Sequence, residues 1–546
     1  MKALDEETGP RAVFADGTQS IFLADFSGDG LTDIVRVRNG EVSYWPNLGH
    51  GRFGAKVGMD HAPWFDAPDV FDSRRIRLAD IDGSGTTDIL YLATTGVRIY
   101  FNQSGNSWSP ACPLAQFPAT DSLASAAVVD LLGNGTACLV WSSPLAGDSR
   151  RPMRYIDLMG GQKPHLLVAA RNNLGAETRV HYAPSTRFYV QDRDAGTPWI
   201  TRLPFPVHVV ERVETLDRIS RNRFVTRYRY SHGYFDAVER EFRGFGRVDQ
   251  WDTEEIGALR PDVTEATNID AASYVPPVHT RTWFHTGVCL GRAHVSDFFA
   301  GLLDLRDRGE YYREPGLTDP QARELLLDDT VLPEGLTVEE EREACRALKG
   351  SMLRQEIYAL DGPGTVDHPH GHPYNITEQN FSIRRVQPQA GNRHAVFFAH
   401  AREALSYQYE RNPSDPRIAH QLTLAVDAFG NVLRSAAIGY GRREADGSLL
   451  LEDQTRQTQL LATYIDNEFT NPIDLPDAYR VPVPSQTRSY EVTGLPPSDQ
   501  QARFTLDEVH QATAQAQDIA YEAPPDGSLQ RRLIEHVRTL YRRNDL

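Results

Sequence analysis

The sequence of 546 residues predicts a mainly β protein with a few inserted helices. Three observations support this fold class. A short acidic, glycine-containing motif recurs near the N-terminus, beginning at Asp25, Asp80 and Asp130, which are 55 and then 50 residues apart. Long segments with period-2 alternation follow from about residue 162, and they are typical of strands. Helix-start signatures are few, so helices are expected only as insertions.

The recurring motif reads LADFSGDGLTDIV at residues 23–35, LADIDGSGTTDIL at 78–90 and VVDLLGNGTACLV at 128–140. Apolar, strand-like residues flank each copy, so each unit is expected to be a small meander of strands. A period of about fifty residues is typical of propeller blades. Residues 1–160 are therefore predicted to form a partial β-propeller of about three blades. Because closed propellers take about four to eight blades, we expect the remainder to come from preceding sequence or another chain.

The first two loops carry oxygen-bearing side chains at positions 1, 3, 5 and 9, a pattern that predicts a Ca²⁺ site. An EF-hand is excluded because Arg36 and Tyr91 occupy position 12, where a Glu is required. The alternative is that the aspartates only close Asx-turns. The third loop has Leu132 and Cys138 at ligand positions, so no metal is expected there. The predicted ligands are Asp25, Ser27, Asp29 and Asp33 in the first loop and Asp80, Asp82, Ser84 and Asp88 in the second.

Beyond residue 162, RNRFVTRYRYSHG alternates two sets of side chains and predicts a strand with two usable faces. Helices are expected to start at Thr318, at Thr337 and at Thr505, each followed three residues later by Gln or Glu in a capping box. The second of these helices is expected to run to Gly350. Residues 416–443 alternate again, turn at Gly430–Asn431 and end on Tyr440, whereas LIEHVRTLYRRNDL predicts a last strand without a closing element.

Composition excludes several functions. The formal net charge of −17 argues against binding to nucleic acid or anionic membranes, which requires a basic surface. No run of 18 apolar residues predicts a transmembrane segment, and the N-terminus lacks the apolar region of a secretory signal peptide. The four cysteines, far apart and without CxxC spacing, are expected to be buried thiols.

No motif predicts catalysis. HExxH, GxSxG and P-loop patterns are absent from the sequence, and the glycines of GHGRFG belong to a repeated turn, not to a dinucleotide fingerprint. His368, His370 and His372 could hold zinc or nickel, but their proline-rich surroundings favour an exposed, solvated loop. The chain is therefore predicted not to be an enzyme.

Several of these segments resemble known repeats and one known family. The acidic loops, with Asn47, Gly49, Gly51 and Phe53, resemble FG-GAP repeats, and residues 416–443 resemble RHS or YD repeats. Together with RNNLGAETRVHYAPSTRFY, PWITRLPFPVHVVERVE and the segment from Arg218 to Glu254, they resemble the B component of bacterial insecticidal toxin complexes, the Tc toxins, and the related SpvB-like proteins.

This resemblance implies a fold and a function. The fold is a partial FG-GAP propeller at 1–160, toxin B-component middle/N-terminal-type β structure at 162–275, middle/C-terminal-type structure with helices and RHS-like strands at 276–455, and further shell strands at 456–546. The function is a non-catalytic scaffold that docks to a pore-forming A component and, with the C component, encloses a toxic cargo. The family's catalytic groups lie in the C component, so no catalytic residue is expected here.

The resemblance also implies location and leaves alternatives. The protein is expected to be made in the cytoplasm and secreted as part of a toxin complex, and the chain is expected to be a fragment or one part of a split protein. The main alternative is a calcium-dependent cell-surface adhesion or glycan-binding propeller. A β-rich glycosidase is a third possibility.

Overall fold

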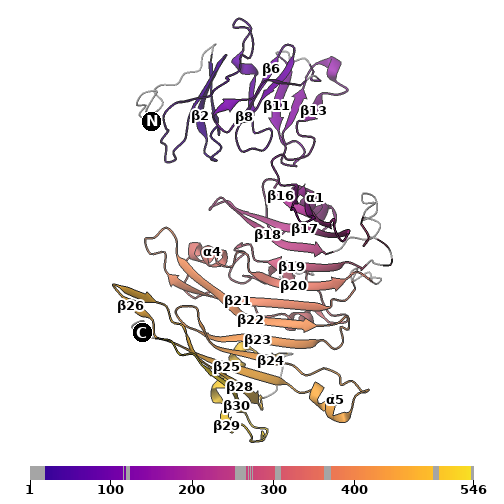
Figure 1. Ribbon diagram of the computed structural model, residues 1–546, viewed down its shortest axis with the longest axis vertical. Coiled ribbons are helices and arrows are strands. Elements are labelled where there is room, and N and C mark those ends of the chain that lie inside the picture. The colour runs from indigo at the N-terminus through magenta and orange to yellow at the C-terminus, as the bar shows by residue number, and fades with distance from the viewer. Residues whose placement is uncertain are drawn as a thin grey trace. The chain divides into compact units, whose positions relative to one another are not determined.

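The computed structural model describes residues 19–114, 116–118, 123–252, 266–268, 270, 272, 275–301, 309–361, 371–495 and 503–542. The chain divides into two compact units. The first comprises residues 1–172, 178–191 and 204–211, and the second comprises 173–177, 192–203 and 212–546. Both are built mainly from strands (Figure 1), which confirms the mainly β prediction. In the described part, no helix is long and apolar enough to cross a membrane.

The first unit contains three small antiparallel sheets, one around each acidic motif, so the predicted meanders are confirmed. The first sheet pairs β1 (Gln19–Ala24), β2 (Asp33–Arg38), β3 (Glu41–Trp45) and β4 (Val57–Gly58). The second pairs β5 (Ile76–Ala79), β6 (Asp88–Ala93), β7 (Gly96–Tyr100) and β10 (Cys112–Leu114), and the third pairs β11 (Ser125–Val129), β12 (Cys138–Ser142) and β13 (Met153–Asp157). A short hairpin joins β8 (Asn102–Gln103) to β9 (Ser107–Trp108).

Aromatic side chains hold the first two sheets together. Phe26, Tyr44, Tyr91 and Trp108 lie in one buried cluster, and the rings of Phe26 and Trp108 meet edge-on with centroids 5.5 Å apart. Because Phe26 and Tyr91 belong to different meanders, the repeated units share a core and do not fold as isolated hairpins.

Apart from one short hairpin, the strands of the second unit belong to one long sheet, drawn in Figure 1 as successive strands from magenta to yellow. From β16 to β30 neighbouring strands are antiparallel, and β29 pairs parallel with β30. A separate hairpin joins β26 (Ile473–Leu475) to β27 (Ala478–Arg480). The strand order is β14 (Ala169–Arg171), β15 (Ala176–Pro184), β16 (His208–Asp217), β17 (Asn222–Asp236), β18 (Glu241–Trp251), β19 (Val278–Phe284), β20 (Met352–Ala359), β21 (Asn375–Gln387), β22 (Val396–Gln408), β23 (Arg417–Val426), β24 (Val432–Gly439), β25 (Leu461–Phe469), β28 (Pro484–Thr493), β30 (Gln530–Arg538) and β29 (Gln517–Ile519).

The hairpin between β23 and β24 forms at the predicted turn. Asp427 accepts hydrogen bonds from the backbone N–H groups of Phe429 and Asn431. Gly430 lies between them at a φ of 91°, a left-handed conformation that favours glycine, and a Cβ there would meet the Phe398 ring at 2.7 Å. Turn chemistry that is visible in the sequence thus sets this register.

The three capping boxes are confirmed. They begin α3 (Asp319–Glu324), α4 (Val338–Arg346) and α6 (Leu506–Gln515). The predicted end of α4 was wrong: the helix stops at Arg346, because hydrogen bonds from Ala347 and Leu348 to residues three positions earlier tighten the chain into turns that end at Gly350. Helices α1 (Ser185–Asp194) and α5 (Leu451–Gln457) were not predicted.

Residues 285–351 connect β19 to β20, and we call them the insertion. The described part carries a turn of 3₁₀ helix at Phe298–Ala300 together with α3 and α4. Its apolar side chains, among them Phe298, Phe299 and Leu348, pack with Trp283 and Phe381 of the sheet in one buried cluster. The insertion therefore covers one face of the sheet.

The prediction that all four cysteines are buried was wrong for two of them. Cys138 and Cys345 are buried, but Cys289 is half-buried and Cys112 is exposed. Cys112 lies on β10, an outer strand of its sheet whose first two residues face solvent.

Candidate functional site

The long sheet of the second unit has two chemically different faces. Directly paired residues on neighbouring strands lie on the same face. Pairing in register continues from Gln355 through Thr377 and Ser406 to Ala419. Twelve half-buried or exposed side chains on this side of β20–β25 carry no charge, and we call this patch the uncharged face: Gln355, Thr377, Ala404, Ser406, Ala419, Gln421, Thr423, Ser435, Ala437, Leu461, Thr463 and Ile465. Arg402 on β22 lies on the same side, next to this patch.

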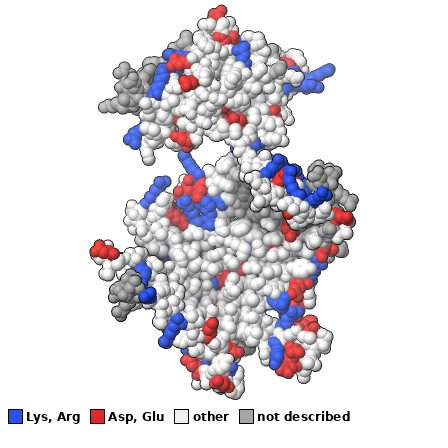
Figure 2. All heavy atoms as spheres, in the orientation of Figure 1, with Lys and Arg blue, Asp and Glu red and all other residues white. Residues whose placement is uncertain are grey.

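The uncharged face is smooth and lacks anchoring side chains. None of its twelve residues is aromatic, and alanines and threonines leave a shallow depression of about 400 Å³ over Ala404, Gln421 and Ala437, which Arg402 also lines. Few charged side chains interrupt the middle of the sheet in the orientation of Figure 2, while basic and acidic groups gather at its margins. Tyr, Trp and Arg dominate binding energy in protein interfaces, so a face without them contacts a polypeptide weakly.

The opposite side, which we call the covered face, carries buried charges. Arg354 on β20 pairs with Glu356 at 2.8 Å and with Glu378 on β21, and all three are at most 6% exposed. Further along, His420 on β23 contacts Glu403 on β22 at 3.2 Å. Buried ion pairs of this kind are costly to break from one side, because the remaining charge is left without a partner.

These carboxylates also hold the insertion on the sheet. Glu356 accepts a hydrogen bond from the Tyr312 backbone N–H at 2.8 Å, and Glu378 accepts one from that of Leu327 at 2.8 Å. The Asn380 side-chain amide donates to the backbone carbonyl of Asp328 at 2.9 Å. Consecutive strands thus satisfy backbone groups of the insertion that would otherwise be buried without a partner.

Glu310 of the insertion forms a second anchor. It accepts hydrogen bonds from His232, from Arg247 and from the Trp283 indole N–H, at 2.7, 2.8 and 2.8 Å. Burial alone would raise the pKa of Glu310, but the charges of Arg247 and His232 and these hydrogen bonds outweigh it and hold the pKa well below its usual range. The carboxylate is therefore ionised at neutral pH and serves as a structural counter-ion.

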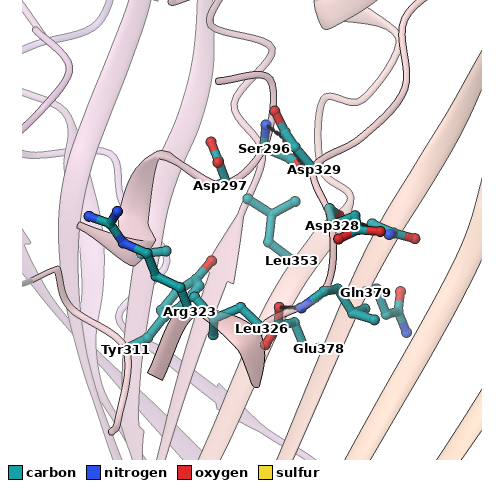
Figure 3. Close-up of a pocket in the computed structure, with 13 residues that line it drawn as sticks. Ser296, Asp297, Tyr311, Arg323, Leu326, Asp328, Asp329, Leu353, Glu378 and Gln379 are labelled. Carbon is teal, nitrogen blue, oxygen red and sulfur yellow. Dashed lines mark hydrogen bonds between the residues drawn. The ribbon is translucent and has the colours of Figure 1, made fainter. Parts of the chain in front are cut away.

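A small acidic cavity lies between the insertion and the sheet (Figure 3). Its volume is about 90 Å³, enough for a few water molecules but below the size of ordinary substrate pockets. The acids that line it already have partners. Asp329 accepts hydrogen bonds from the backbone of Val295 and Ser296, and Asp297 contacts His294 at 3.0 Å.

Two acids that line the cavity, Asp297 and Glu378, have a raised pKa, and burial is the main cause in both. Burial, and then the nearby charge of Asp329, raise the pKa of Asp297 to about 6. In an open cleft such a group would be a candidate general acid. Here the cavity is too small to bring an organic substrate to it.

In the first acidic loop of the other unit, the predicted ligands mainly close turns. Asp25 accepts hydrogen bonds from the backbone N–H groups of Gly28 and Gly30 at 2.7 and 2.8 Å. Asp29 accepts one from Leu31, and Asp33 accepts from Phe26, Ser27 and Asn47. Ser27 donates its hydroxyl to Asp25. Of these contacts, the one between Asp29 and Leu31 has the spacing of an Asx-turn, and the others tie the loop to its own backbone and to Asn47. Calcium binding in this loop stays a prediction.

The second loop brings carboxylates together. Oxygen atoms of Asp80, Asp82 and Asp88 lie within 4.8 Å of one another, the one such group in the part of the chain that the structure describes. Ser84, the fourth predicted ligand, instead contacts the Thr86 hydroxyl at 3.0 Å. Burial, opposed by two backbone hydrogen bonds and reinforced by Asp82 and Asp80, raises the pKa of Asp88 to about 7. A hard divalent cation would neutralise this repulsion, so the donor set fits Ca²⁺.

The third loop shows what the motif does without the full ligand set. Asp130 accepts hydrogen bonds from the N–H groups of Asn134 and Gly135, as Asp80 does from Ser84 and Gly85. The first aspartate of the motif therefore closes the loop whether or not a cation can bind.

Of the three histidines that were considered for zinc, His368 and His370 lie outside the described residues, and His372 contacts the Tyr312 hydroxyl at 2.8 Å.

Sequence reasoning missed the buried charges of the covered face. Arg354, Glu356 and Glu378 stand in alternating strand segments, where charged residues ordinarily predict a solvated face. The only available signal was the long stretch between the strands at 278–284 and 352–359, which is too long for a hairpin and has to cover something.

Comparisons with known proteins agree with this architecture. A family model described as the insecticide toxin TcdB middle/N-terminal region matches residues 102–287, and one for the middle/C-terminal region matches 343–478. The structure is similar to a crystal structure of TcdB2-TccC3, with 29% identity and a TM-score of 0.74 over 90% of this chain and 23% of that one.

A second solved structure, the Tc holotoxin pore of Photorhabdus luminescens, gives 28% identity and a TM-score of 0.76 over 96% of this chain and 23% of that chain. The chain thus spans less than a quarter of the length of either of these two chains. A search of curated proteins found no match. Together the two matched regions and the shared fold show that the chain belongs to the TcdB family of B components of insecticidal Tc toxin complexes.

Proposed function

We propose that the chain is a non-catalytic structural component of a bacterial multi-subunit toxin, and that its long sheet forms part of a wall around a toxic cargo. The observation that carries this proposal is the chemical difference between the two faces. The covered face is stiffened by the insertion and by buried ion pairs, whereas the uncharged face offers hydroxyl, amide and methyl groups without aromatic or cationic anchors.

An enclosing wall needs this combination. A cargo that makes many strong contacts with the wall can leave only by breaking them, which costs binding free energy. A smooth, uncharged surface excludes the cargo from solvent with little binding energy. Such a role requires no chemistry from the wall. The small cavity and its partnered acids support the same view, because they offer no room for a substrate.

The assignment of parts follows. The first unit, with residues 1–160, is proposed to be a partial propeller of FG-GAP type that docks to the pore-forming A component, and the strands from about residue 162 to 546 are proposed to build shell. The C component, TccC3 in the solved complex, would complete the enclosure. This assignment places the protein outside the producing cell, as part of the assembled toxin.

Association is the direct test. The chain, co-expressed with the A-type and C-type components encoded beside it, should co-purify with them through size-exclusion chromatography. An informative variant is Val537→Lys. Val537 is 48% exposed on β30, whose pairing with β29 ends at Arg532, and a lysine on an open strand edge disfavours pairing with another chain.

The matched control is Leu475→Lys on the separate hairpin, where the side chain is 63% exposed. We expect weaker co-purification of the C-type component with the first variant only. A chain that stays alone in the presence of every companion component would contradict the proposed function.

Calcium is proposed to stabilise the first unit through Asp80, Asp82 and Asp88. A chelator should then lower the melting temperature of the chain, because a ligand bound only to the folded state stabilises it by mass action. The decrease in melting temperature should be larger when the sample contained more calcium before the chelator was added. Asp80→Asn should abolish the calcium response, whereas Asp130→Asn in the third loop should retain it. Identical melting curves with and without chelator would show that calcium does not stabilise the unit and that the aspartates of the second loop only close a turn.

The second candidate function, calcium-dependent adhesion, rests on the same carboxylates. It predicts that the chain alone binds immobilised glycans or host-cell surfaces, and that chelator reverses the binding. Calcium-dependent stability without such binding would leave the metal a structural role.

A further inference from the structure

The insertion begins and ends at the same place on the sheet. The backbone N–H of His285 donates to the carbonyl of Ser351 at 2.9 Å, and that of Gly350 donates to His285 at 2.8 Å. Gly287, two residues after His285, also lies close to the other segment. A Cβ at this position would be 3.2 Å from the Cα of Arg346. Segments about sixty residues apart in the sequence are therefore in direct backbone contact at the base of the insertion.

Two cysteines stand at this base. Cys345 is in the last turn of α4 and is fully buried, and Cys289, two residues after Gly287, is half-buried. Cys345 lies in the buried cluster that includes Trp283 and Leu348, Cys289 packs against the same cluster, and each thiol shifts the pKa of the other. Two cysteines that stand on segments in backbone contact, with side chains in the same cluster, are placed as a disulfide requires.

The surroundings favour reaction at Cys289. The hydrogen bond from Cys345 lowers the pKa of Cys289, against burial, with further help from the backbone N–H of Gly291 and the charge of Arg342. The same contact, together with burial, raises the pKa of Cys345. A thiolate is the nucleophile in disulfide exchange, and here it forms on the half-exposed sulfur that an external reagent can reach.

We propose that Cys289 and Cys345 form a redox-active dithiol that closes the insertion covalently when an external disulfide such as oxidised glutathione is present. The Cys289 thiolate attacks one glutathione sulfur, forms a mixed disulfide and releases a glutathione thiolate. The Cys345 thiol then loses its proton and attacks the Cys289 sulfur, which releases the second glutathione thiolate. Two electrons pass to the oxidant, and the two thiol protons leave to solvent or to the released thiolates.

The disulfide would act on the insertion, which shields the covered face from solvent. Cys289 and Cys345 bracket the 3₁₀ turn at Phe298–Ala300, α3 and most of α4. A covalent link at the base prevents the insertion from separating from β19 and β20 as an open loop, and it reduces the conformational freedom of the unfolded chain. The inference concerns this chain alone and does not depend on the proposed function.

The test uses the full chain in mixtures of oxidised and reduced glutathione, followed by mass spectrometry of the non-reduced digest. We expect a linked Cys289–Cys345 peptide that disappears on reduction, loss of two of the four free thiols, and a higher melting temperature in the oxidised sample. The rise should vanish in Cys289→Ser and persist in Cys112→Ser, which removes the exposed thiol of the other unit.

Two results would overturn the inference. One is that Cys112 becomes glutathionylated, so that the oxidant is active, while no linked Cys289–Cys345 peptide forms at any ratio. The other is that Cys289→Ser retains the rise in melting temperature. Peptide mapping of the unmodified chain decides the matter even if a serine variant folds poorly.

Discussion

Replacing Arg354 with methionine is expected to destabilise the second unit by about 3–5 kcal/mol, the cost of removing one member of a buried ionic group. Arg354 is 3% exposed and is the cation shared by Glu356 and Glu378. Its guanidinium also stacks over the Tyr311 ring at 4.7 Å from the centroid. Methionine fills much of the volume but leaves two carboxylates facing each other without a counter-charge. The midpoint of urea unfolding, followed by circular dichroism, measures the effect.

Two further variants separate charge from packing. Arg456→Met removes one member of an exposed pair, in which Arg456 and Glu452 are 67% and 75% exposed, so it should change the unfolding free energy by less than about 0.5 kcal/mol. The double change Arg354→Met with Glu378→Leu removes a stranded charge and should recover part of the loss. If Arg354→Met unfolded at the urea midpoint of the unmodified chain, the ionic group would not be what holds the insertion in place.

The second large effect is expected from Trp283→Ala, which should cost about 3–5 kcal/mol, as large-to-small changes of buried aromatic residues do. Trp283 is fully buried at the centre of the cluster between the insertion and the sheet. Its ring meets Tyr311 edge-on with centroids 5.0 Å apart, and its indole N–H donates to Glu310 at 2.8 Å. The substitution therefore opens a cavity and removes one donor from a buried carboxylate.

The control is Trp64→Ala, because the side chain of Trp64 is 69% exposed and its removal should stay within about 0.5 kcal/mol. Limited proteolysis provides a second measurement. In Trp283→Ala, cleavage within residues 285–351 should become faster than cleavage in the first unit, since the insertion loses its main apolar contact. Equal rates in both units would contradict a local role for this cluster.

Short-range chemistry explains which parts of the fold were predictable. The Thr337–Glu340 capping box started α4 where the sequence placed it, and the Asp427–Asn431 turn joined two strands where the sequence predicted a turn. Both depend on residues within a few positions of each other, so composition and order specify them. The end of α4 was predicted too far along, because its last turn tightens against the base of the insertion.

The candidate site depended on contacts that sequence order does not contain. Alternation along β20 and β21 predicts two faces but not which one is covered, and it gave no reason to bury Arg354 or Glu378. The same holds for the acidic loops, which read almost identically. Asp80, Asp82 and Asp88 converge within 4.8 Å, although Asp80 and Asp88 accept hydrogen bonds from backbone N–H groups just as Asp25 and Asp33 do.

The sequence by itself determined the mainly β class, the repeated acidic loops, the helix starts and the resemblance to Tc toxin B components, because each is encoded in local patterns or in long ordered matches. The tertiary structure alone decided that the insertion covers one face of the sheet, that the opposite side carries an uncharged patch, and that Cys289 and Cys345 pack in the same cluster. The physical reason is that these features arise from pairing between segments tens of residues apart, where burial and electrostatics act across strands that the chain order separates.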